Sequence, residues 1–196
     1  MRKLILFISV LVMGITMEAQ QTVGSFQNSY FNKELTIEAA QKKDKLQSVY
    51  IGVIAKGAKN AFISVDGKEL ESFKISLELL RDKYIEWVKV AKDNNVTEMV
   101  KDFDIKFPSV TIAWHRTKWW FSFGNKINMK FLILEDGNMV ASWAPTVTSS
   151  SNRYLDEQIF FVFGDEEDFN NLISQLDSQR ILNDLLNIKN NEDLFK

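Results

Sequence analysis

The residues best suited to binding chemistry form one short segment, in which His115, Arg116 and Lys118 stand among tryptophans. Basic groups interleaved with aromatic rings can bind phosphates or stack on nucleic-acid bases. The whole chain, however, carries 24 basic and 26 acidic residues, so no charge field points to nucleic acid or to an anionic membrane. We favour a solvated turn at a strand end as the explanation of these charges, and we keep the three residues as candidate binding residues.

A second candidate set depends on how the strands pair. We predict two-residue turns at Gly124–Asn125 and Asp136–Gly137. These turns place Trp119 opposite Lys130, and Lys130 opposite Trp143, on one face of a sheet. Such a row could bind a sugar or an anionic ligand, but we favour a plain cation–π contact, in which the lysine stem lies on the rings and the ammonium reaches water. Finding Lys130 and Trp143 on opposite faces would refute this register.

Few catalytic chemistries fit the composition. The chain has no cysteine and one histidine, which nearly excludes the usual zinc sites, and no glycine-rich phosphate loop or dinucleotide motif is present. We therefore expect no metal and no cofactor. The serines of 148–153 lack a nucleophile turn, and the acidic run 165–168 is what a helix N-terminus favours. Glycoside hydrolysis needs only two carboxylates, which the composition supplies, so a hydrolase stays an alternative to the favoured non-enzyme.

The N-terminus is typical of a signal peptide. A short basic start, Arg2–Lys3, precedes the apolar run Leu4–Ile15, and Ala19–Gln20 offers a cleavage point. The run is shorter than the roughly 20 residues that span a bilayer. We predict a signal peptide over 1–19, a single domain over 20–196, and a periplasmic or secreted location without stable membrane insertion after cleavage.

Several segments have clear element patterns. Residues 35–40 and 49–55 read as strands, and Asp66–Gly67 predicts a hairpin between 61–65 and 68–73. The lead-in 21–33 reads as irregular. Ser76 is expected to cap a long amphipathic helix that stops at Asn94–Asn95. Its apolar face comprises Leu77, Leu80, Tyr84, Trp87, Val88 and Ala91.

The end of the chain predicts two further helices. Asp165 can cap the first, and Asp177 or Ser178 can cap the second after a break. Between the long helix and these two, the strands of 104–163 carry apolar residues on both faces, so we expect the sheet to be covered on both sides. The fold class predicted is α+β: a bent antiparallel β-meander packed against a long amphipathic helix, with the C-terminal helices elsewhere.

The function predicted is that of an exported, non-catalytic binding module. Its partner would be an unknown protein or a small-molecule or glycan ligand, and not nucleic acid. Two alternatives stay open, namely a small secreted hydrolase that uses paired carboxylates and a self-assembling structural protein of the cell exterior.

Overall fold

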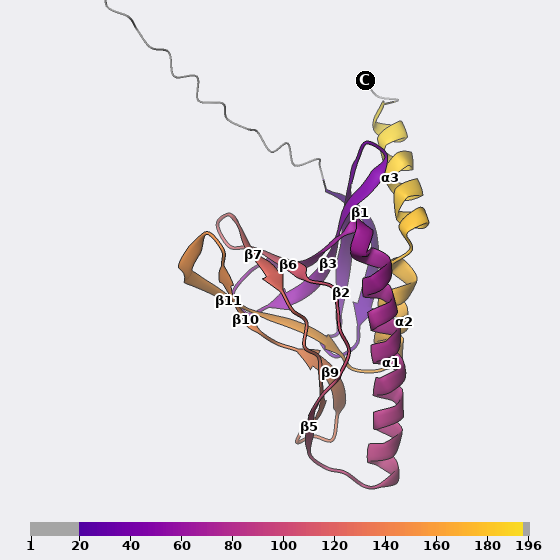
Figure 1. Ribbon diagram of the computed structural model, residues 1–196, viewed down its shortest axis with the longest axis vertical. Coiled ribbons are helices and arrows are strands. Elements are labelled where there is room, and N and C mark those ends of the chain that lie inside the picture. The colour runs from indigo at the N-terminus through magenta and orange to yellow at the C-terminus, as the bar shows by residue number, and fades with distance from the viewer. Residues whose placement is uncertain (1–19, 194–196) are drawn as a thin grey trace, which may run out of the picture.

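The structure, a computed structural model, describes residues 20–193 and has an α+β fold, which confirms the predicted class (Figure 1). The predicted signal peptide lies outside these residues. An eleven-stranded antiparallel sheet is combined with three α-helices. The strands are β1 Gln21–Asn28, β2 Lys33–Lys42, β3 Lys45–Ala55, β4 Asn60–Asp66, β5 Met99–Asp102, β6 Val110–His115, β7 Trp119–Asn125, β8 Lys130–Ile133, β9 Met139–Trp143, β10 Thr146–Ser149 and β11 Asn152–Phe163. The helices are α1 Leu70–Asp93, α2 Glu166–Gln175 and α3 Ser178–Asp193.

The sheet is not a simple meander. Its strand order is β5-β8-β9-β11-β3-β4-β6-β7, with β2 beside β3, β1 beside β2, and β10 beside β11. The long strand β11 pairs in turn with β10, with β3 and with β9. Ser150, which follows β10, donates its backbone N–H to the Phe121 carbonyl over 2.8 Å, and its Oγ accepts from Phe123 N over 3.0 Å. These bonds bring β10 against β7, so the sheet curls back on itself.

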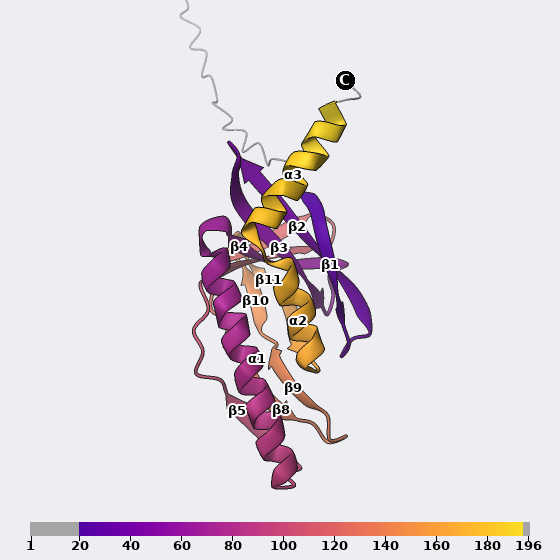
Figure 2. The ribbon, with the colours of Figure 1, turned by 90° about the vertical axis from the view of Figure 1, so that its right-hand side faces the viewer.

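The helices lie along one side of the sheet, and α1 and α2 run side by side (Figure 2). The ring of Tyr84 joins them, because it packs 5.5 Å from that of Phe169 in α2. The Tyr84 hydroxyl is shared between the carbonyls of Met139 and Gly164, at 2.7 and 2.9 Å. The expectation that the C-terminal helices lie apart from the long helix is therefore wrong for α2. None of the described helices is long and apolar enough to cross a membrane.

The long helix begins earlier than predicted, and the hairpin at Asp66–Gly67 does not form. A short 3₁₀ turn, Gly67–Glu69, leads directly into α1, and the Asp66 carboxylate accepts from Lys68 N. Leu70 and Phe73 are fully buried and continue the apolar stripe of the helix upstream. Ser76 is therefore not a cap: it lies inside the helix, and its hydroxyl contacts the carbonyls of Ser72 and Lys106.

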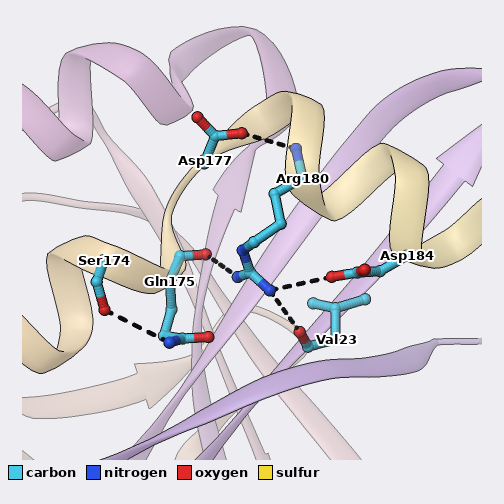
Figure 3. Close-up of polar contacts among 6 residues, drawn as sticks. All are labelled: Val23, Ser174, Gln175, Asp177, Arg180 and Asp184. Carbon is cyan, nitrogen blue, oxygen red and sulfur yellow. Dashed lines mark hydrogen bonds and ion pairs between the residues drawn. The ribbon is translucent and has the colours of Figure 1, made fainter.

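The predicted break between the last two helices is confirmed. The Asp177 carboxylate caps α3 by accepting from Arg180 N over 2.6 Å. The side chain of Arg180 turns back across the break (Figure 3). It donates to the carbonyls of Val23 and Gln175 and to the carboxylate of Asp184. Arg180 thus ties α3 both to the end of α2 and to β1.

The lead-in that reads as irregular is in fact β1, and a buried carboxylate fixes the turn after it. Asp168 of α2 is 1 % exposed. It accepts from Ser29 N at 2.6 Å, Ser29 Oγ at 3.0 Å and Gly164 N at 2.7 Å. The turn between β1 and β2 is thereby held against the start of α2.

Candidate functional site

The turn between β8 and β9 overturns part of the predicted register. Its loop has three residues, Glu135–Gly137, and only Gly137 has a positive φ, of 84°. A three-residue loop with glycine in the left-handed conformation is a common hairpin connection. It shifts the pairing by one residue, so Lys130 lies opposite Ser142 and not opposite Trp143.

The other predicted turn, at Gly124–Asn125, is also wrong. Asn125 belongs to β7 and pairs with Val110, because β7 forms its hairpin with the preceding strand β6. Lys130 instead lies 3.4 Å from the Asp102 carboxylate at the sheet edge. Trp143 is 7 % exposed and pairs with Phe161 in the core. The structure therefore does not bring Trp119, Lys130 and Trp143 together.

Four of the six candidate binding residues do come together, in the hairpin of β6 and β7. His115 pairs with Trp119, and Arg116 and Lys118 stand in the turn between them. The ammonium of Lys118 lies 4.3 Å from the ring centre of Trp120. This cation–π contact fixes the lysine stem while the side chain remains exposed.

Trp119 and His115 are part of a continuous row of rings across four strands. We call Tyr50, Phe62, Trp119 and His115 the aromatic row. Ring centres are 6.4 Å apart from Tyr50 to Phe62, 5.9 Å from Phe62 to Trp119, and 5.2 Å from Trp119 to His115. Their intervening neighbours Ile51, Ile63 and Trp114 are fully buried in the core. Because side chains alternate along a strand, the aromatic row points to the outer face.

The outer face remains open at its β7 end, contrary to the expectation that both faces are covered. Trp119 is 37 % exposed and Phe123 is 65 % exposed, whereas Phe62 is buried beneath its neighbours. The rings of Phe121 and Phe123 are parallel, with centres 6.2 Å apart. Polar side chains share this face, since strand pairing places Asn60 beside His115 and Ser64 beside Thr111. The surface thus combines rigid rings with hydrogen-bonding groups.

A second feature lies at the end of the curled sheet, where three connections meet. Glu157 of β11 is 2 % exposed. One of its carboxylate oxygens accepts from Gly57 N over 2.8 Å, and the other accepts from Arg116 Nε and Nη2 over 3.0 and 2.9 Å. Arg116 Nη2 also donates to the Asp156 carbonyl. A methyl group on Gly57 would lie 3.0 Å from Nη2, so the glycine permits this close approach.

The ion pair forms the floor of an open hollow of about 400 Å³. We call this hollow the mouth of the curled sheet. It is lined by Lys56, Gly57, Arg116, Thr146, Asp156, Glu157 and Gln158. The mouths of curled and closed sheets are frequent ligand sites.

A larger hollow, of about 560 Å³, lies between α1, the β8–β9 turn and the start of α2. Two of its carboxylates have structural partners: Asp93 pairs with Lys89 at 3.4 Å, and Asp165 caps α2. Burial, together with Asp165 and Asp168, raises the pKa of Tyr84 well above its usual value.

No group of three or more histidine, cysteine or acidic side chains suited to a metal occurs within residues 20–193.

Sequence reasoning missed Tyr50, Phe62 and Glu157. The first two could have been found from strand alternation in 49–55 and 61–65, once β4 is paired with β6. The partner of Glu157 lies 41 residues away across the curl, and no local pattern indicates it.

Comparison of the chain with protein-family models, with curated proteins and with solved structures finds no match.

Proposed function

We propose that the protein is exported through the predicted signal peptide and acts as a non-catalytic module that binds a glycan. The aromatic row, extended by Phe121 and Phe123, is the proposed binding surface. The exposure of Trp119 and Phe123, two aromatic side chains of β7 that are 37 % and 65 % exposed, carries this proposal. Large exposed rings on a soluble domain commonly mark an interaction site.

The geometry suits sugar rings in particular. The C–H faces of a sugar pack on aromatic rings, and its hydroxyls need nearby donors and acceptors. Trp119 is held by ring contacts with Phe62 and His115, so little side-chain freedom is lost on binding. Asn60, beside His115, can hydrogen-bond a hydroxyl at the same level of the sheet.

The hydrolase alternative has less support. Among the carboxylates of the hollow between α1 and the start of α2, Asp93 and Asp165 already serve an ion pair and a helix cap. The buried carboxylate Glu157 is saturated by Gly57 and Arg116. A protein partner would also use exposed aromatics, and it is the outcome indicated if every glycan fails to bind.

The test is affinity electrophoresis of the purified protein in gels that contain soluble neutral or acidic polysaccharides. Stacking on an aromatic ring contributes about 1–3 kcal/mol in comparable single-ring contacts. Trp119→Ala and Phe123→Ala should therefore weaken binding about tenfold. Val100→Ala, which also removes an exposed apolar side chain but on β5, is the control and should bind normally. Equal binding by Trp119→Ala and Val100→Ala would contradict the proposal.

Export is tested separately by the mass of the protein recovered from the periplasm or the medium. A mass that corresponds to a chain starting near Gln20 is expected. A full-length mass in that fraction would refute cleavage of the signal peptide.

A further inference from the structure

We infer that the mouth of the curled sheet is a subsite for an acidic group, a carboxylate or a sulfate, carried by the glycan. This inference rests on the proposed function, because it names the class of glycan that the aromatic row would bind. It is carried by the way in which a buried carboxylate holds Arg116 at the floor of the mouth.

Three segments that are distant in sequence supply the mouth. Lys56 N donates to the Gln158 carbonyl over 2.9 Å, and Lys59 N donates to the His115 carbonyl over 3.1 Å. These bonds fix the β3–β4 connection between β11 and the β6–β7 turn. Arg116 reaches across to Glu157 from that turn. The side chains that line the mouth are thus attached to strands and to the short connections between them, and not to a long loop.

We interpret the ion pair of Arg116 and Glu157 as a device that positions the guanidinium and not as one that stabilises the fold. Burying the Glu157 carboxylate costs desolvation energy that its attraction to the partly exposed Arg116 largely has to offset, so the pair contributes little net stability. Glu157 engages Nε and Nη2 of Arg116, whereas Nη1 makes no hydrogen bond with the described residues. The side chain of Arg116 is 39 % exposed. The Arg116 guanidinium is therefore fixed in orientation and can donate to an anionic oxygen of a ligand.

The charges around the mouth favour an anion. Among the residues that line the mouth, Lys56 and Arg116 balance Asp156 and Glu157. The exposed residues Lys59 and Lys118, on the β3–β4 connection and the β6–β7 turn beside the mouth, add two positive charges. The remaining field is positive although the whole chain has a net charge of −2. A positive field of this kind attracts an acidic ligand in a salt-dependent manner.

The mouth and the aromatic row share one hairpin. His115 and Trp119 are the paired residues at the ends of the turn that carries Arg116 and Lys118. A glycan stacked on Trp119 can therefore extend an acidic substituent over the turn into the mouth. Both features then act on one ligand.

The experiment measures dissociation constants by calorimetry with three probes: polygalacturonate for a carboxylate, dextran sulfate for a sulfate, and dextran as a neutral glycan. Lys56→Gln should weaken binding of the preferred acidic probe about fivefold, as expected for a rim charge. Replacing the ion pair by amides, Arg116→Gln with Glu157→Gln, should weaken it about tenfold or more. Lys126→Gln makes the same charge change at the far end of β7 and is the control. Raising the salt concentration should weaken the wild type more than the double variant.

The outcomes separate the inference from the proposed function. Binding of dextran that depends on Trp119, with no preference for either acidic probe, overturns the inference and leaves the proposed function intact. Acidic binding that is equal in Lys56→Gln and Lys126→Gln and unchanged in the double variant also overturns the inference. Acidic binding that needs Lys56 but not Trp119 supports the anion subsite and contradicts the aromatic surface. Failure to bind any of the three probes contradicts both.

Discussion

Replacing Asp168 by alanine should destabilise the protein more than replacing an exposed carboxylate at the start of α2. The variant leaves two backbone N–H groups, those of Ser29 and Gly164, without the carboxylate that they contact at 2.6 and 2.7 Å. A fully buried donor that loses its partner costs about 1–3 kcal/mol, but Ser29 is exposed and Gly164 is half-buried, so the two together cost roughly 1–3 kcal/mol. The Ser29 hydroxyl can rotate and adds less.

The matched control is Glu166→Ala, which removes an exposed carboxylate from the same helix turn. It should lose only the interaction with the helix dipole, about 0.3–1 kcal/mol. Urea unfolding followed by circular dichroism gives the free energy of unfolding of both variants. If the cost of Asp168→Ala exceeds that of the control by less than about 1 kcal/mol, the view that this carboxylate anchors the β1–β2 turn is wrong. Asp168→Asn, which keeps one acceptor oxygen, should fall between the two.

Three further predictions follow from titration and from the backbone. The pKa of Tyr84 is raised, so the folded state keeps its proton longer than the unfolded chain; wild-type stability should be complete below about pH 10 and fall above it, and Tyr84→Phe should flatten that fall. Burial also raises the pKa of Glu38 above its ordinary 4.5, which makes the ionised form unfavourable; Glu38→Gln should raise the melting temperature at pH 7 and change it little at pH 3.5. Gly137→Ala should cost about 1 kcal/mol in urea unfolding, because φ is 84° there although open space surrounds the site, and an equally stable variant would contradict the strain argument.

The limits of sequence reasoning show at the turns. The glycines at 124 and 137 are both predicted to lie in turns, and both have positive φ, but Gly124 lies within β7 beside a register shift and only Gly137 lies in a turn. The sequence could not show which glycine marks a turn or how many residues the turn takes, and one extra residue at 135–137 was enough to separate Lys130 from Trp143. Register depends on such a count, since every side chain changes face when it shifts by one.

The start of α1 shows a different limit. Residues 68–73 satisfy a strand pattern and a helix pattern equally well over so short a span. The helix forms because Leu70 and Phe73 continue the stripe of Leu77 and Leu80 into the core.

By contrast, the hairpin of β6 and β7 groups four candidate residues because they are neighbours in sequence. Its contact with Glu157 is long-range and becomes visible only in the folded chain.

The position of β11 has a consequence for the order in which the chain can fold. This strand joins β3 of one part of the sheet to β9 of the other, through Ile159 opposite Ala55 and Phe161 opposite Trp143. It also supplies Glu157 to the mouth. Contacts between residues so far apart in sequence must await the synthesis of most of the chain, and folds rich in them form slowly. A chain that lacks its last 45 or so residues would have no β11 and therefore no strand to join the two parts of the sheet.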